Sequence, residues 1–215
     1  QLLHQIAMEV LGSPIAKVRK NEIDFTPPFR RLTMVDAIKE YADVDIKEMD
    51  EAALREVCKK LHIEVDPSMG KGKLIDEIFG EKVEKHLIQP TYITDYPIEM
   101  TPLAKKHRTD EGFVERFELF VNTSELANAY TELNHPLDQR ARLEDQLKLA
   151  ARGDDEAMAL DNDFLRAMEY GMPPMSGLGI GIDRLTMLLT DQTSIQEVIF
   201  FPQMKKEKEK DKKES

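Results

Sequence analysis

The sequence predicts an α+β fold in which an antiparallel β-sheet is flanked by helices. Its 215 residues are 41% hydrophobic and 33% charged, which is enough apolar material for one core. Segments with strand-like and helix-like patterns follow one another without the regular alternation that a parallel sheet requires. No apolar run approaches the roughly eighteen residues of a membrane-spanning helix. We therefore expect no membrane partner.

Apolar residues at three- and four-residue intervals predict the helices, and breaker residues set their ends. We expect helices at residues 2–11, 33–41, 50–61, 73–87, 136–150 and 155–170. A capping box from Thr33 to Asp36 starts the second helix, and Pro136 suits the first turn of the fifth. We expect residues of about 45–88 to form a small helical insertion.

Runs of β-branched and aromatic residues predict the strands. We expect strands at residues 23–25, 29–32, 90–97, 113–122 and 125–133. The last two form an antiparallel hairpin that turns at residues 122–124. A further strand begins at Ser176 and leads into a helix near Arg184.

The charge balance is acidic, with 30 lysines and arginines against 41 aspartates and glutamates, a net charge of −11. Such a surface repels polyanions and argues against a general nucleic-acid coat. Residues 205–215 hold six lysines and four acids in alternation, which predicts a charged disordered tail. The single cysteine, Cys58, cannot form an internal disulfide, and the sequence opens without an export signal, so we expect a cytoplasmic protein.

Three of the ten glycines fall at positions 177, 179 and 181, the densest local anomaly in the sequence. Glycine at every second strand position leaves one face of the strand without side chains. Two interpretations remain open: close packing against a helix, or a flat ligand on the bare face with Arg184 reaching its charge. The spacing differs from the pyrophosphate-binding G-x-G-x-x-G fingerprint.

Acidic residues are the second anomaly of the predicted hairpin. They are Glu115, Glu118, Glu125 and Glu132, and they lie among apolar strand residues. One interpretation places them on the solvated face of an amphipathic sheet, because a buried carboxylate without a partner is costly. The other uses Glu118 and Glu125 across the hairpin as ligands of Mg²⁺, which prefers carboxylate oxygens and substrate phosphates.

Strand alternation predicts a polar pocket wall on the second strand of the hairpin. Leu126, Asn128, Tyr130 and Glu132 fall on one side, and residues 127, 129 and 131 on the other. Simple alternation places Glu125 and Asn128 on opposite sides of the strand. For Glu125 to reach the side of Asn128, the strand must contain a bulge, or Glu125 must be free to turn because it stands at the start of the strand.

Other kinds of site find little support in the sequence. The five histidines are scattered without a paired ligand spacing, which makes a zinc site improbable. A nucleophile elbow, a P-loop and a cysteine–histidine constellation are absent from the sequence. The basic run at residues 105–108 is more typical of a solvated loop than of a phosphate or RNA contact.

Several segments together resemble the class II lysyl-tRNA synthetases. They are residues 118–120, 124–134, 177–185 and 198–202, with 23–25, 29–31 and 86–90. The glycine-rich segment resembles the third class II signature of the aspartate-type subgroup. Within that subgroup, residues 128–132 and 86–90 resemble the synthetases specific for lysine. It covers nearly the whole sequence up to about residue 203.

The resemblance implies a six- or seven-stranded antiparallel sheet with ATP bent upon it. Lysine and ATP would form lysyl-adenylate and pyrophosphate, and the lysyl group would then pass to the 3′ end of tRNA(Lys). ATP-binding residues would be Glu118, Glu125, Gly181 and Arg184, with both glutamates holding Mg²⁺ and Arg184 acting as the catalytic residue. The lysine pocket would comprise Asn128, Tyr130, Glu132, Gly177 and Gly179, with Glu132 paired to the ε-ammonium.

Some features of the family find no counterpart in the sequence. They are the anticodon-binding barrel, the first signature with its dimer helix, and the second signature with its α-phosphate arginine. We therefore expect residues 1–204 to be the C-terminal part of a catalytic domain, incomplete at its N-terminal side, from a homodimeric parent. We also expect these residues alone not to activate lysine.

Two other functions remain open at this point. One is a lysine-adenylating paralogue that modifies a protein rather than tRNA, which an upstream anticodon-binding barrel would argue against. The other is a non-catalytic binding module derived from the same core, which would bind neither Mg-ATP nor lysine.

Overall fold

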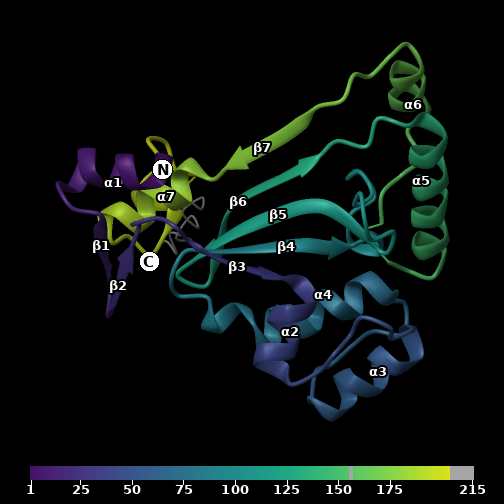
Figure 1. Cartoon of the computed structure of the whole chain (residues 1–215), viewed down its shortest axis with the longest axis horizontal. Coiled ribbons are helices and arrows are strands. Elements are labelled where there is room, and N and C mark those ends of the chain that lie inside the picture. Colours follow the sequence, from purple (N-terminus) through teal and green to yellow (C-terminus); the bar gives the residue numbers. More distant parts are fainter. Residues whose placement is uncertain (155–156, 204–215) are drawn as a thin grey trace, which may run out of the picture.

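The structure is a computed structural model and describes residues 1–154 and 157–203. Its centre is a five-stranded sheet of order β3-β4-β5-β6-β7, and a separate two-stranded ribbon pairs β1 with β2 (Figure 1). The strands are β1 Ile15–Val18, β2 Asn21–Asp24, β3 Arg30–Thr33, β4 Thr91–Pro97, β5 Phe113–Val121, β6 Ser124–Thr131 and β7 Ser176–Ile180. Strand β3 is parallel to β4 and the other neighbours are antiparallel, which confirms the predicted mixed fold with an antiparallel sheet.

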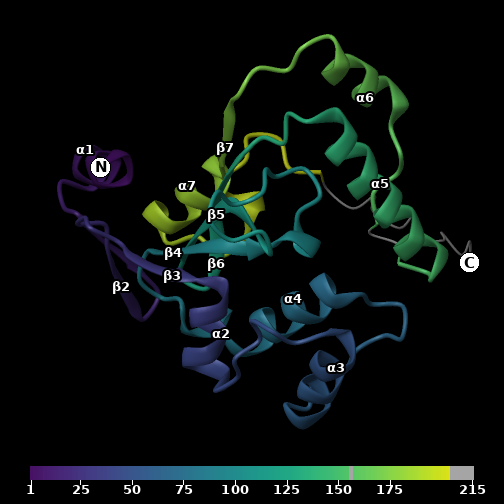
Figure 2. The same ribbon diagram turned by 45° about the vertical axis from the view of Figure 1, so that its right-hand side comes forward.

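Seven α-helices surround this sheet within the described part of the chain. They are α1 Leu2–Leu11, α2 Met34–Ala42, α3 Glu51–Lys60, α4 Lys71–Lys82, α5 Pro136–Ala151, α6 Asn162–Glu169 and α7 Ile182–Thr190. Both views place α2–α4 beside β3–β5, α5 and α6 beyond one end of the sheet, and α1 with α7 at the other end (Figures 1 and 2). Across the described residues, none of these helices has the length and apolar character to cross a membrane.

The larger core lies between helices α2–α4 and one face of β4 and β5. Ile38, Leu54, Leu74, Ile78 and Ile93 are fully buried in it. Burying each such side chain contributes about 1.5–3 kcal/mol. The predicted insertion thus shares its core with the sheet, and its status as a separate unit stays a prediction.

A second core lies on the opposite face of the sheet. Helices α1 and α7 and the β1–β2 ribbon meet β5 and β6 there, through side chains such as Ala7, Ile23, Leu119, Val121 and Leu185. Because α7 belongs to this core, its first turn is held against the start of β6. The backbone N–H of Gly181 donates to the carbonyl of Leu126 at 2.8 Å, which fixes the point where α7 begins.

A β-bulge interrupts the hairpin of β5 and β6. Leu119 pairs with Ala127 but Phe120 pairs with Glu125, so Glu125 and Leu126 together oppose one residue. Glu125 therefore shares the face of Phe120, two residues along from Glu118. Leu126 instead packs in the second core. The prediction that Leu126 lies on the side of Asn128 is wrong, because simple alternation ignores the extra residue.

Other expected boundaries also change. The helix predicted at 155–170 is wrong in length: α6 begins only after Asp161, whose side chain caps it by accepting from the N–H of Phe164 at 2.9 Å. Residues 157–161 are not helical, and residues 155–156 lie outside the described part. Strand β1 was not expected, and α4 ends at Lys82 before a short 3₁₀ turn at Glu84–His86. The expected tail at 205–215 also lies outside the described residues.

Candidate active site on the β5–β7 face

The pairing register gathers the candidate residues on one face of three strands. Glu118 pairs with Asn128, and Asn128 in turn pairs with Gly179. Along the same face, Tyr130 pairs with Gly177 on β7. Directly opposed residues of antiparallel strands point to the same side of a sheet. The glutamate, the amide, the phenol and two glycines therefore surround one area. For Asn128 and Tyr130 this is the shared face that strand alternation predicted.

Glu118 is held by two neighbours. One carboxylate oxygen forms an ion pair with Arg116, and the other accepts from the Tyr96 hydroxyl at 2.8 Å. Burial raises the pKa of the Glu118 carboxyl, Arg116 and Tyr96 lower it, and the charges of Glu125 and Asp76 raise it further. Arg116 was missed by the sequence reasoning, although its place two residues before Glu118 on the same strand face would have indicated it.

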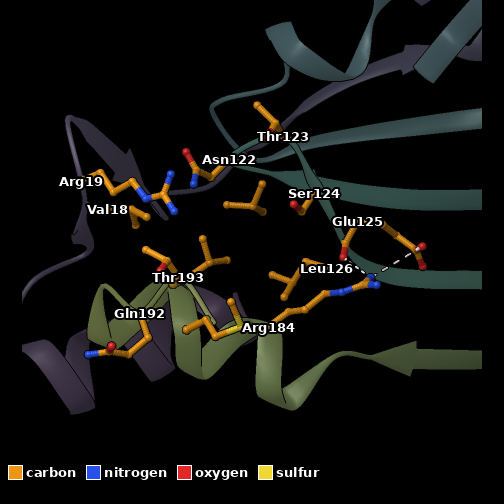
Figure 3. Close-up of a pocket in the computed structure, with 13 residues that line it drawn as sticks. Val18, Arg19, Asn122, Thr123, Ser124, Glu125, Leu126, Arg184, Gln192 and Thr193 are labelled. Carbon is orange, nitrogen blue, oxygen red and sulfur yellow. Dashed lines mark hydrogen bonds and ion pairs between the residues drawn. The ribbon is translucent and has the colours of Figure 1, made fainter. Parts of the chain in front are cut away.

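Glu125 lies at the bulge and has a different arginine as its partner. A guanidinium nitrogen of Arg184 lies 3.8 Å from the Glu125 carboxylate and donates to its backbone carbonyl at 2.6 Å (Figure 3). The Arg184 side chain is 56% exposed, so it is available to a ligand. The two glutamates and Arg184 thus lie at the same end of the sheet face.

A small pocket of 230 Å³ lies on the other side of Arg184. The β5–β6 turn, the end of β1 and helix α7 line it (Figure 3). Arg19 and Asn122 border the pocket, and the Arg184 guanidinium extends away from both toward Glu125 (Figure 3).

A larger cleft of 700 Å³ opens beside Glu118, between α4, α5 and the sheet. Asp76 and Glu84 of the helical segment line its acidic end together with Glu118. Burial raises the pKa of the Glu84 carboxyl, and the charges of Asp76, Glu118 and Glu125 add to the rise. These four carboxylates therefore lie close enough to interact.

Glu118 and Glu125 fit the donor set that Mg²⁺ takes beside a nucleotide. In the described residues, no group of three or more histidine, cysteine or acidic side chains has the geometry to hold a metal by itself. Mg²⁺ commonly binds through one or two carboxylates, with substrate phosphates and water completing its shell. Two carboxylates on one face match that requirement without a third protein ligand.

Glu132 ends the line of polar residues on this face. Burial raises the pKa of its carboxyl, and its charge in turn helps burial raise the pKa of the Tyr130 hydroxyl. A Cβ atom at Gly177 would lie 2.5 Å from a carboxylate oxygen of Glu132, so the carboxylate rests directly over this glycine. Its side chain has no hydrogen-bond or ion-pair partner within residues 1–154 and 157–203. A partly desolvated carboxylate in this state favours a cationic ligand.

The three glycines differ in what they accommodate. Gly177 makes room for Glu132, and a Cβ at Gly181 would contact the Arg184 side chain at 3.4 Å. At Gly179 the nearest atom to such a Cβ is 3.9 Å away, so the face above it is open. Packing against a helix thus applies at Gly181, which meets α7, while Gly177 meets a side chain of the neighbouring strand. At Gly179 the surface is bare, and a ligand on it stays a prediction.

Glu115 and the basic run at residues 105–108 lie apart from this site. Glu115 lies on the opposite face of β5, accepts from the Thr131 hydroxyl at 2.8 Å and forms a 2.8 Å ion pair with Arg108. Lys105 donates to Asn134 at 2.9 Å. The run therefore makes local contacts, in keeping with the loop interpretation.

The structure thus brings together, on one antiparallel sheet, two carboxylates, a glycine-rich strand and an arginine on the helix that follows it. Residues 1–205 match the family described as tRNA synthetases class II (D, K and N), and the chain belongs to that family.

Curated relatives give a narrower similarity. The chain is 64% identical over 208 residues to a lysine–tRNA ligase of Porphyromonas gingivalis strain ATCC 33277 and 61% identical to those of Azobacteroides pseudotrichonymphae and Christiangramia forsetii. Each comparison covers 97% of this chain. The chain spans only 36%, 42% and 37%, respectively, of the length of these relatives.

Proposed function

We propose that these residues form part of the catalytic domain of a lysine–tRNA ligase, which joins lysine to ATP as lysyl-adenylate and then transfers the lysyl group to tRNA(Lys). In the first step the lysine carboxylate attacks the α-phosphorus of ATP, and pyrophosphate leaves. The second step moves the lysyl group from the adenylate to the 3′ end of the tRNA. The observation that carries the proposal is the Glu132 carboxylate, which has no partner among the described residues. It lies on the sheet face that bears Glu118 and Glu125, with Arg184 of α7 beside Glu125.

For the nucleotide, Glu118 and Glu125 would hold Mg²⁺ and Arg184 would contact the adenine and the γ-phosphate. Gly181 would give the Arg184 side chain room to take this position. When bound, Mg²⁺ supplies charge neutralisation for the phosphates. Charge neutralisation and positioning lower the barrier of phosphoryl chemistry more than a covalent nucleophile does.

For the amino acid, Glu132 would pair with the ε-ammonium of lysine. An ammonium group that leaves water without an acidic partner is strongly disfavoured, so this carboxylate would select lysine over uncharged amino acids. Asn128 and Tyr130 would line the same pocket, Gly177 would leave space for the Glu132 carboxylate, and Gly179 would leave space for the substrate.

The remaining partners follow from the family. The proposed partner of the second step is the acceptor end of tRNA(Lys), and the parent enzyme would be a cytoplasmic homodimer. An acidic chain is compatible with this partner if the anticodon end binds to a separate, upstream domain.

The test is lysine-dependent ATP–pyrophosphate exchange and tRNA(Lys) charging by the complete gene product that contains these residues. We expect both activities, with lysine preferred over the other standard amino acids. A gene product that performs the exchange and attaches lysine to a protein, but does not charge tRNA(Lys), would instead be the protein-modifying paralogue. Failure to bind either Mg-ATP or lysine in a folded protein would identify the binding module.

The 215 residues by themselves need a separate experiment. We expect them to show no lysine-dependent exchange above a Glu118→Ala control, because the α-phosphate arginine and one pocket wall of the family are absent from the sequence. Exchange well above that control would show that these residues suffice for activation.

A further inference from the structure

Arg116 lies between the two halves of the candidate active site, and its side chain is only 15% exposed. One guanidinium nitrogen pairs with Glu118, and another donates to the Thr101 hydroxyl at 2.5 Å. The remaining nitrogen, Nε, donates to the Asn128 side-chain oxygen at 3.3 Å. The guanidinium also lies 4.5 Å from the centre of the Tyr96 ring. All three nitrogens and one face of this group thus contact neighbouring side chains.

The contact with Glu118 orients the carboxylate without blocking it. One oxygen bonds to Arg116 and the other to Tyr96, and each carboxylate oxygen can accept a second bond. The side chain of Glu118 is 12% exposed, so these two bonds determine where its remaining lone pairs point. Residues that orient a metal ligand in this way affect metal affinity strongly.

The contact with Asn128 orients the amide. Because an arginine N–H can only donate, the amide must present its carbonyl oxygen to Arg116. Its NH₂ group is then left to bind an acceptor, and within the described ranges this group has no partner. Asn128 lies opposite Gly179, where the face of the sheet is open.

We propose that Arg116 is a positioning residue that couples the two half-sites, so that Mg-nucleotide at Glu118 and amino acid at Asn128 bind more tightly together than separately. This inference rests on the proposed function. The physical basis is that one rigid, planar fork holds both side chains, so the ligand that orders one of them also orders the other. A lysine at this position would keep the positive charge, but its single ammonium group lacks the planar set of donors that holds both side chains.

The experiment measures lysine affinity by calorimetry on the complete gene product, with and without Mg²⁺ and α,β-methylene-ATP. This non-reacting analogue prevents turnover. We expect the nucleotide to tighten lysine binding about tenfold, within the usual range of coupling between sites. In Arg116→Lys the ratio of the two affinities should fall below about twofold. A purely structural role would weaken both affinities and leave this ratio unchanged.

Arg108→Lys is the matched control, because Arg108 pairs with Glu115 on the opposite face of the same strand. It should keep the wild-type ratio. If Arg116→Lys does not fold, Thr101→Val replaces it, since this change frees one end of the guanidinium and leaves both half-sites intact. The ratio should then fall about threefold.

The following results would count against the inference. A wild-type protein that binds both ligands without mutual effect, or an unchanged ratio in Arg116→Lys, would overturn the coupling and leave the proposed function standing. With Thr101→Val in its place, an unchanged ratio has the same meaning. A folded wild-type protein that binds neither ligand would overturn the proposed function itself.

Discussion

Strands β4 and β7 belong to one sheet but differ in what surrounds them. Strand β4 pairs on both sides and is covered by the larger core, and Ile93 at its centre is fully buried. In the described part of the chain β7 pairs only with β6, and Leu178 at its centre is 61% exposed. The covered strand contributes apolar burial to stability, whereas the exposed strand leaves open surface at Gly179, where we propose that a ligand lies.

The candidate site lies where these two environments meet. Glu118 and Arg116 are on β5, within reach of the buried Tyr96, and Gly179 and Glu132 border the open area. The proposed nucleotide-binding carboxylate is therefore held by the covered region, and the proposed lysine-binding carboxylate lies beside the open area. Changes in the two regions should consequently affect different measurements.

The largest effect is expected from Glu132→Gln on the exposed side. Removing the charge leaves the lysine ammonium unpaired, which costs about 3–5 kcal/mol and lowers lysine-dependent exchange on the order of a hundredfold or more. Exchange assays on the complete gene product check this. Glu115→Gln, which changes the same residue type on the opposite face, is the control and should stay near wild type. A Glu132→Gln protein within threefold of wild type would remove lysine selection from this carboxylate.

The next effect is on stability and belongs to the covered strand. Ile93→Ala creates a cavity in the larger core and should lower the free energy of unfolding by about 2–5 kcal/mol. The same truncation at the exposed Leu178 should change it by less than about 0.5 kcal/mol. Urea unfolding of the two variants tests this contrast. Equal losses would mean that β7 is as well packed as β4.

A smaller effect distinguishes two glycines of β7. Gly177→Ala forces the Glu132 carboxylate to move, because the added Cβ would lie 2.5 Å from it. We expect a loss of about 1–2 kcal/mol in lysine affinity, typical of overpacking, measured by calorimetry on the complete gene product. At Gly179 the added Cβ meets nothing closer than 3.9 Å, so Gly179→Ala should leave folding stability unchanged. A Gly179→Ala protein that is less stable than wild type, together with a Gly177→Ala protein that binds lysine as wild type does, would contradict this distinction.

The smallest effect concerns pH. Burial raises the pKa of Glu132 above its ordinary value of 4.5, so the folded protein binds this proton more tightly than the unfolded chain does. The stabilisation that comes from this tighter proton binding is fully present below about pH 4.5. It is lost as the pH rises through the raised pKa of Glu132. Glu132→Gln should therefore match wild type in acid and be the more stable protein near neutral pH. Urea unfolding across this range measures the difference, and the opposite sign would mean that Glu132 has a cationic partner.

Much of the exposed region could be predicted from local patterns. The alternating glycines indicated a bare strand face, and alternation along β6 placed Asn128, Tyr130 and Glu132 together. Both patterns depend only on the two-residue period of a strand. The resemblance to synthetases added roles to these residues, and those roles remain predictions.

The covered region was less predictable. Arg116 drew no attention because an isolated arginine in a strand usually indicates a solvated position. Its importance depends on Tyr96, Thr101 and Asn128, which come from different segments and meet only in the folded chain. The predicted start of α6 was also wrong. The helix begins after the cap at Asp161, which outweighs the helical spacing of the residues before it.

Local spacing in the sequence determined which segments are helices and strands, and it determined that β7 would be short of side chains. The tertiary structure alone decided which acids share a face, because the bulge opposite Phe120 depends on how two strands pair. It also decided which charges are neutralised, with Arg116 at Glu118 and Arg184 at Glu125. The physical reason is that strand period is a property of neighbouring residues, whereas register, burial and ion pairing are properties of segments that meet only on folding.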